Sequence, residues 1–170
     1  MKDETLPPIL KVQSSILAST LGATLATKRS SAEHGAVSSK LVIEPYANPF
    51  RLYPLRNDYN KFKDLFENQH VDCYVINTGF FLDSNITPKI TLGLIEKIIN
   101  NDIVFKPFAG LDQLFYTDIP GFNPDFTSKS YIKLFKERLM NRVNFIEHLY
   151  NQDILPNEAK DSLQEIINSL

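Results

Sequence analysis

The stretch DCYVINTGFFLDSNITPKIT, residues 72–91, decides which fold the sequence encodes. Its apolar run at residues 73–76 is short and continuous, and such a run predicts a strand covered on both faces. Thr87 followed by Pro88 predicts a helix start, because a hydroxyl can cap the first turn and proline loses no hydrogen bond there. The stretch therefore predicts a buried strand, an irregular loop and a helix that ends at residue 100 or 101.

Hydrophobic spacing outside this stretch predicts a chain in which strands alternate with helices. Helices are predicted at residues 11–27, 57–68, 128–150 and 157–170, and short strands at residues 41–44, 51–55, 103–106 and 113–117. Residues 28–40 have the composition of a polar loop, and residues 120–124 that of a turn. The alternation predicts a fold of the α/β (mixed α+β) class, with a mixed sheet and flanking helices.

The predicted domain organisation is simple. Residues 1–10 read as an extended lead-in, because the prolines at positions 7 and 8 disfavour helix in what precedes them. Residues 11–170 contain no internal repeat, low-complexity tract or Gly/Ser linker, so we expect a single domain there. A chain of 170 residues buries roughly 70% of its unfolded surface, which is enough for one hydrophobic core.

Composition excludes several classes of function and partner. The formal net charge is −2, which leaves no electrostatic footprint for nucleic acid or anionic lipid. No apolar run approaches the ~18 residues of a membrane span, and the first residues lack the basic-then-apolar layout of a signal peptide. The single cysteine excludes an intrachain disulfide and a zinc site of paired cysteines. We therefore expect a soluble cytoplasmic protein.

Motifs for common catalytic and metal chemistry are missing from the sequence. It contains no GxxxxGK[ST] phosphate loop, no GxGxxG and no GxSxG. His34, His70 and His148 fall in a loop, at a helix end and on a helix, without the spacing of metal ligands. Surface positions are the favoured interpretation for all three, with a metal or base role as the alternative. Cys73 is interpreted as a small buried hydrophobe, and we predict no catalytic residue and no metal ligand.

The loop after the predicted strand has the features of an anion-binding site. In open α/β sheets, ligands bind at loops that leave the carboxyl ends of strands, which is where Asn77, Thr78 and Gly79 fall. The free N–H groups at the start of the next helix, with Lys89 beside them, could hold an anion. The spacing also fits a purely structural interpretation, in which Asn77 to Gly79 form only a turn and Thr91 fills the core. Both interpretations stay open on spacing alone.

CYVINTGF at residues 73–80 and KITLGLIEKII at residues 89–99 resemble a passage in the C-terminal part of ATP-dependent phosphoenolpyruvate carboxykinases. In that family a strand of the type YLVNTG leads into a loop, and the next helix opens with a Thr that lies against the adenine of ATP. The resemblance implies that Thr91 contacts adenine or ribose and that Lys89 lies on the phosphate side. It also implies that the Asn-Thr-Gly turn shapes the loop around the nucleotide.

The resemblance extends in order along most of the chain. Further matching passages are residues 6–29, 48–66, 115–124 and 131–149, and they imply the fold of the family's C-terminal lobe. The loop after the Asn-Thr-Gly turn departs from the family pattern. The family carries a Gly-x-Gly-Lys-Arg run there, whose Arg contacts the nucleotide, whereas this sequence has Ser84 and Asn85 near the place of the basic pair. The resemblance thus implies a divergent branch of the family.

The resemblance covers only part of the family's catalytic machinery. The phosphate loop, the metal-binding Lys, His and Asp, and the oxaloacetate-binding Arg precede this region in the family and have no counterpart in these 170 residues. The parent reaction is phosphoryl transfer from ATP to the enolate formed when oxaloacetate loses CO₂, with Mg²⁺ and Mn²⁺ as cofactors. Because such a transfer needs phosphate cradle, metal and acceptor together, the chain alone is expected to be inactive.

Two hypotheses for the function remain from the sequence. In the first, the chain is the nucleotide-side lobe of a carboxykinase-like protein, as a fragment of a longer protein or as a separate chain. Its partners are then a nucleotide and an N-terminal catalytic lobe. In the second, it is a non-catalytic structural or protein-interaction domain that retains the fold, and its twelve Phe and seven Tyr residues leave an exposed apolar face for a partner.

Overall fold

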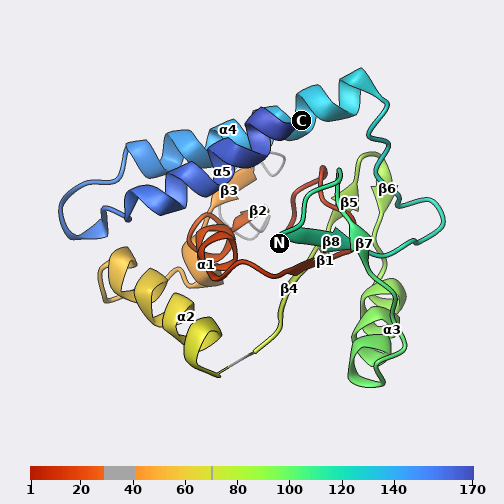
Figure 1. Ribbon diagram of the computed structural model, residues 1–170, viewed down its shortest axis with the longest axis horizontal. Helices are drawn as coiled ribbons and strands as arrows, with labels where there is room; N and C mark the ends of the chain where they lie inside the picture. Colours follow the sequence, from red (N-terminus) through yellow and green to blue (C-terminus); the bar gives the residue numbers. More distant parts are fainter. Residues whose placement is uncertain (29–40, 70) are drawn as a thin grey trace, which may run out of the picture.

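Helices and antiparallel strands make up the chain in the computed structural model, which describes residues 1–28, 41–69 and 71–170 (Figure 1). The main sheet has four strands in the order β4-β1-β8-β7. Their bounds are Ile9–Val12 for β1, Cys73–Ile76 for β4, Lys106–Pro107 for β7 and Leu114–Tyr116 for β8. Two smaller sheets pair β2 (Ala26–Lys28) with β3 (Leu41–Ile43) and β5 (Phe80–Phe81) with β6 (Ser84–Asn85).

The helices of the described residues lie around these sheets. They are α1 (Ser15–Ala23), α2 (Leu55–Gln69), α3 (Pro88–Ile99), α4 (Lys129–Glu147) and α5 (Asn157–Ser169), with the 3₁₀-helices η1 (Pro45–Ala47) and η2 (Asn151–Asp153). α4 packs beside α5, and α5 packs on α1, whereas α3 lies apart from the other helices at the opposite end of the molecule (Figure 1). The prediction of a mixed α and β class is therefore confirmed.

β1 is the central link of the main sheet. Leu10 pairs with Val75 of β4 on one side and with Tyr116 of β8 on the other. Every strand pair in the described residues is antiparallel. β4 lies at an edge of the sheet and its four side chains are half-buried, so the prediction of a strand covered on both faces is wrong. A run of four apolar residues has no periodicity that separates an edge strand from a central one.

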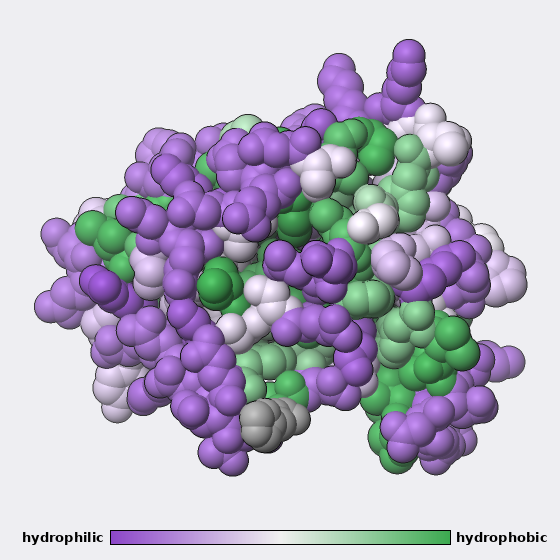
Figure 2. All heavy atoms as spheres, viewed as in Figure 1, coloured by the Kyte–Doolittle hydropathy of each residue, from purple (hydrophilic) through white to green (hydrophobic). Residues whose placement is uncertain are grey.

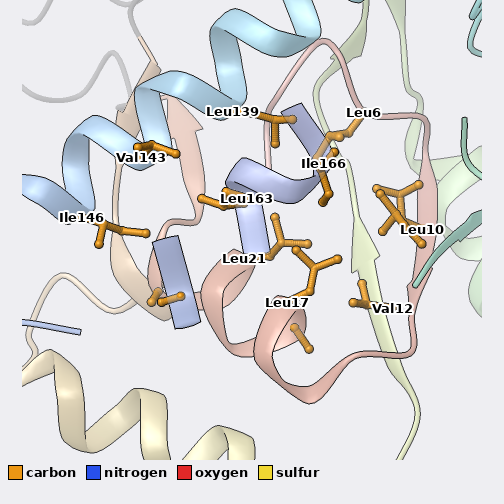
Figure 3. Close-up of a cluster of buried hydrophobic side chains, with 14 of the residues drawn as sticks. Leu6, Leu10, Val12, Leu17, Leu21, Leu139, Val143, Ile146, Leu163 and Ile166 are labelled. Atoms are coloured by element: carbon orange, nitrogen blue, oxygen red, sulfur yellow. The ribbon is translucent and has the colours of Figure 1, made fainter. Parts of the chain in front are cut away.

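α1 lies at the centre of the helical core. Ser14 caps its first turn by accepting a hydrogen bond from the Leu17 N–H at 3.2 Å. Leu17 and Leu21 of α1 meet apolar side chains from α4, α5 and the N-terminal segment (Figure 3). The other labelled members of this cluster are Leu6, Leu10, Val12, Leu139, Val143, Ile146, Leu163 and Ile166. Burial of each such side chain stabilises the fold by about 1.5–3 kcal/mol.

The first eight residues are packed into the domain rather than leading up to it. The buried Asp3 carboxylate pairs with Arg142 of α4, at 2.8 Å between Oδ2 and Nη2, and it accepts a 2.7 Å hydrogen bond from the Thr5 hydroxyl. The Tyr131 hydroxyl of α4 donates to the Thr5 C=O at 2.8 Å. The structure therefore differs from the expected lead-in at residues 1–10. Two prolines exclude a helix there, but they leave an extended segment free to pack.

Three predicted element boundaries differ in the structure. The predicted helix at residues 11–27 divides into part of β1, the shorter helix α1 and β2, because strand pairing overrides the helical spacing at both of its ends. The predicted strand at residues 51–55 is absent, since α2 already begins at Leu55, two residues before the predicted cap at Asn57. β7 begins only at Lys106. Most of the predicted polar loop, residues 29–40, lies outside the described residues.

Candidate functional site

Asn77, expected in a ligand-binding loop, holds the chain's own backbone. Its side chain is fully buried. The side-chain amide donates to the backbone C=O groups of Asp3, Leu6 and Phe80 over 2.7–2.9 Å, and its oxygen accepts from the Gly79 N–H at 3.1 Å. Both amide protons and the carbonyl oxygen are thus engaged within the protein. Asn77 fixes the turn against the N-terminal segment and has no donor left for a ligand.

Thr78 and Gly79 also face the N-terminal segment. Thr78 is exposed, and its backbone N–H donates to the Met1 C=O at 2.9 Å. A Cβ atom on the buried Gly79 would lie 3.2 Å from the Cβ of Lys2, so the close approach favours glycine. The Gly79 C=O accepts from the Ile86 N–H at 2.9 Å, which closes the β5–β6 hairpin. These contacts support the structural interpretation of the turn.

A cleft of about 540 Å³, which we call the α3 cleft, lies beside the helix that follows this turn. α3 forms one wall, and the segments at residues 102–104 and 117–120 form the other. Ile90 and Leu94 on the helix side and Ile103 and Ile119 opposite give it apolar walls. Figure 2 shows further apolar surface where α3 lies in Figure 1. Leu92 and Ile99 of α3 and Val104 after it are exposed.

The charged side chains of the cleft are two lysines of α3 and two aspartates, Asp102 and Asp118. Lys89 and Lys97 both line it, about two turns apart on one helix face. Neither forms an ion pair with a described residue. Across the cleft the Asp118 carboxylate is engaged by the Lys106 ammonium at 2.5 Å, and this hydrogen bond raises the pKa of Lys106. The arrangement suits a ligand with a flat or apolar part and an anionic group.

Thr91 lies on α3 but does not line the α3 cleft. It is half-buried on another face of the helix, and its backbone N–H donates to the Thr87 C=O at 3.2 Å. The structure therefore separates the five predicted nucleotide-binding residues. Lys89 lies in the cleft, Thr91 lies on a different face of the same helix, and residues 77–79 lie against the N-terminal segment.

The sequence did not predict the rest of the cleft. The expected site relied on loops that leave the carboxyl ends of parallel strands, and the described strands are all antiparallel, so their loops do not meet at one such edge. The apolar wall at residues 103 and 119 comes from two segments between helices, and their proximity is a tertiary property. The one available signal for Lys97 is its position eight residues after Lys89, which places both on the same helix face.

A second surface feature, which we call the 51/150 patch, joins the segment before α2 to the segment after α4. Its large exposed apolar side chains are Phe50, Leu52, Tyr53 and Tyr150. Residues 51–54 and 150–153 line one shallow hollow. Arg51 reaches the Asp153 carboxylate through Nη2 at 3.4 Å. The Nη1 atom of Arg51 is buried and has no hydrogen-bond partner among the described residues.

His148 has the surface position that the sequence predicted, whereas Cys73, predicted to be buried, is half-buried on the edge strand β4. The Cys73 thiol packs against the hydrophobic core, and burial raises its pKa to about 11, so little thiolate is present at neutral pH. His148 is exposed at the end of α4, where its Nδ1 lies 2.7 Å from the Asn144 C=O. His34 and His70 lie outside the described residues.

The described residues contain no cluster of three or more His, Cys, Asp or Glu side chains that could hold a metal ion. None of the helices in residues 1–28, 41–69 and 71–170 combines the length and apolar character needed to cross a lipid bilayer.

Comparison with known proteins gives no family assignment. No protein-family model matches the chain, and no curated protein matches it significantly. The function is therefore inferred from the resemblance of short passages and from the geometry of the α3 cleft.

Proposed function

We propose that the chain is the nucleotide-side lobe of a phosphoenolpyruvate carboxykinase-like protein. The observation that carries the proposal is Lys89, which the resemblance assigns to the phosphate side of the nucleotide and which lines the α3 cleft. Lys97 supplies a second cation on the same wall, and Ile90 and Ile119 offer apolar surface on opposite walls for a planar base. Asn77 supports the preceding turn through its buried hydrogen bonds rather than by touching the nucleotide.

The catalytic groups come from a partner in this proposal. Phosphoryl transfer needs metal ions and a phosphate cradle held in place around the reacting oxygens, and the described residues lack a metal-binding cluster. An N-terminal lobe, in the same or a separate chain, would supply both. The assembled protein would then transfer a phosphoryl group from ATP to the enolate formed when oxaloacetate loses CO₂.

Isothermal titration of the chain with ATP tests the nucleotide site. Lys89→Ala should weaken ATP binding roughly 5-fold, which corresponds to about 1 kcal/mol for one partly solvated charge contact. Lys133→Ala removes an exposed lysine of α4 that does not line the cleft, so the affinity should stay unchanged. Adenosine lacks phosphates and should bind the parent and the Lys89 variant equally.

Two results would contradict the proposal at different levels. Equal ATP affinity of the parent and Lys89→Ala would remove Lys89 from the site. Failure to bind ATP even together with the partner lobe would remove the nucleotide role altogether. Thr91→Val tests the predicted contact between the Thr91 hydroxyl and ribose or adenine. If that contact exists, the variant should bind both ATP and adenosine more weakly than the parent.

The 51/150 patch favours a second function, that of a protein-interaction domain. Leu52 is 91% exposed and Tyr150 is 74% exposed, and side chains of this kind mark interaction surfaces when they gather. The buried Nη1 of Arg51 lacks an acceptor among the described residues, and such a group costs about 1–3 kcal/mol until an acceptor arrives.

A photo-crosslinking amino acid tests the second function. Benzoylphenylalanine in place of Tyr53 should give a discrete adduct in cells, whereas the same group in place of Asn60, exposed on α2, should give none. If neither position gives an adduct, the 51/150 patch is ordinary solvent surface.

A further inference from the structure

The outer edge of β4 carries backbone groups without a partner. β4 pairs only with β1 among the described strands, and on that side the Asn77 N–H donates to the Pro8 C=O at 3.0 Å. Because backbone groups alternate along an antiparallel strand, the odd-numbered residues of β4 also direct their N–H and C=O groups toward β1. Tyr74 and Ile76 therefore direct theirs outward.

Met1 already occupies one end of this outer edge. Its nitrogen donates to the Ile76 C=O at 3.1 Å, and its C=O accepts from the Thr78 N–H at 2.9 Å. These two bonds have the pattern of a strand that runs parallel to β4 and lies opposite Asn77. Beyond Met1, the Ile76 N–H and the Tyr74 C=O have no backbone partner among the described residues.

An apolar cleft of about 240 Å³, which we call the β4 cleft, lies along the same edge. Leu21, Leu25, Tyr46 and Phe62 contribute to its lining, opposite the residues of β4. β4 has the sequence CYVI, which favours strands and contains neither Pro nor Lys, the residues that commonly protect an edge from pairing. Edge and cleft together suit an extended chain whose backbone pairs with β4 and whose apolar side chains enter the cleft.

We propose that the outer edge of β4 binds an extended segment of another polypeptide, with alternating apolar side chains, that runs parallel to β4 toward Met1. The hydrogen bonds of Met1 set the direction and the register of this segment. A single strand fits better than the β4 edge of a second copy, because two-fold pairing of β4 with itself would be antiparallel, whereas Met1 pairs parallel to β4. The surface is separate from the α3 cleft, and its occupation does not depend on nucleotide binding.

A synthetic hexapeptide, acetyl-VTVTVT-amide, tests the proposal on the full chain. Hydrogen exchange measured by NMR should find the Ile76 amide unprotected without peptide and the Val75 amide protected, because the latter faces β1. Saturating peptide should slow exchange at Ile76 about tenfold or more. A nitroxide at the N-terminus of the peptide should broaden the Asp72 amide signal more than that of Thr78, as a parallel strand requires.

Two chain variants and one altered peptide serve as controls. Leu25→Lys places a charge in the β4 cleft and should weaken peptide binding about tenfold. Leu92→Lys changes an exposed leucine of α3 and should leave binding unchanged. A peptide that carries N-methyl groups on its pairing amides should not bind.

Four results would each overturn the proposal. They are an Ile76 amide already protected without peptide, no slowing of its exchange at millimolar peptide, equal binding of the N-methylated peptide, and a nitroxide effect centred on Thr78. Loss of ATP binding in Lys89→Ala bears on none of them, so the two proposals fail independently.

Discussion

At the scale of single residues, Asn77 shows how one side chain can join parts of the chain that are distant in sequence. Its amide group binds the C=O groups of Asp3 and Leu6, which lie in the N-terminal segment, and that of Phe80 in the following hairpin. Buried carbonyl groups need such partners, because an unsatisfied one costs free energy. Asn77 therefore has a structural role at the first position of the Asn-Thr-Gly turn, and this role does not depend on a ligand.

Asn77→Ala should lower the free energy of unfolding by about 2–4 kcal/mol, since it removes several buried hydrogen bonds and leaves carbonyl groups unpaired. Urea unfolding followed by circular dichroism measures the change. Asn60→Ala, at an exposed position on α2, is the matched control and should stay within about 0.5 kcal/mol of the parent. A loss below about 1 kcal/mol in Asn77→Ala would contradict the role given to this side chain.

The Cys73 thiol should react slowly and with a high pH midpoint. Burial raises its pKa to about 11, compared with about 8.5 for an unfolded thiol. Because the folded pKa is the higher one, this group's contribution to stability is fully present below about pH 8.5 and is lost as the pH rises toward 11. Rates of iodoacetamide labelling across this range, with and without urea, measure both midpoints. Equal midpoints near 8.5 would show that the thiol is not buried.

Residue-scale features were predictable where they depend on neighbours in sequence. α3 begins at Pro88 as predicted, but the Thr87 hydroxyl makes no capping hydrogen bond. Ser128 accepts the Tyr131 N–H at 3.4 Å at the start of α4. The role of Asn77 was not predictable, because two of its three carbonyl partners lie more than seventy positions away. A local sequence pattern predicts the turn, but it does not predict the distant carbonyl groups that accept hydrogen bonds from Asn77.

At the scale of elements, α4 is joined to the N-terminal segment by two ion pairs of different burial. Arg142 and Asp3 are both buried, and the Arg142 guanidinium also donates to the Thr24 C=O. Arg138 and Glu4 form the second pair, one turn earlier on α4, where both side chains keep some contact with water. The two pairs provide a comparison of burial within one helix.

Arg142→Met should lower the free energy of unfolding by about 3–5 kcal/mol, because it leaves the Asp3 carboxylate buried without its partner. The double variant Asp3→Asn/Arg142→Met should lose less than the sum of the single variants. Arg138→Met breaks the more exposed pair and should cost at most about 1 kcal/mol. Thermal and urea unfolding measure the parent, the single variants Arg142→Met, Asp3→Asn and Arg138→Met, and the double variant. Equal losses in the two arginine variants would contradict the difference in burial.

Elements with strong helical periodicity and clear caps were predicted close to their observed bounds. α3, α4 and α5 begin and end within a few residues of the prediction. The prediction failed at residues 11–27, where pairing of β1 with β4 and of β2 with β3 competes with helical spacing, and at residues 51–55, where no sheet partner exists among the described strands. Strand direction was also not predictable, because it depends on pairing between distant segments.

At the scale of the whole molecule, the chain alone should bind ATP without consuming it. At the α3 cleft the described residues supply lysines and apolar walls. The described residues contain no metal-binding cluster, and phosphoryl transfer needs bound metal ions as well as a bound nucleotide. An assay of ADP release with oxaloacetate, ATP, Mg²⁺ and Mn²⁺ should stay at the level of a protein-free blank. Turnover above the blank that disappears in Lys89→Ala would show that this chain supplies its own catalytic groups.

The mixed class of the fold followed from the alternation of strands and helices, but the location of the candidate site did not. The predicted site residues are neighbours in sequence, and the structure distributes them between the N-terminal segment, the α3 cleft and another face of α3. Their distribution depends on how the N-terminal segment packs, which no local pattern encodes.

The central place of β1 has a consequence for synthesis of the chain on the ribosome. β1 needs β4 and β8 as neighbours, and α1, which follows it, is covered by α5 near the C-terminus. At a translation rate of about 5–20 residues per second, several seconds pass between the appearance of β1 and that of its last partner. During this interval the nascent chain exposes the apolar stretch at residues 9–23, which makes that stretch the natural place for a chaperone to bind.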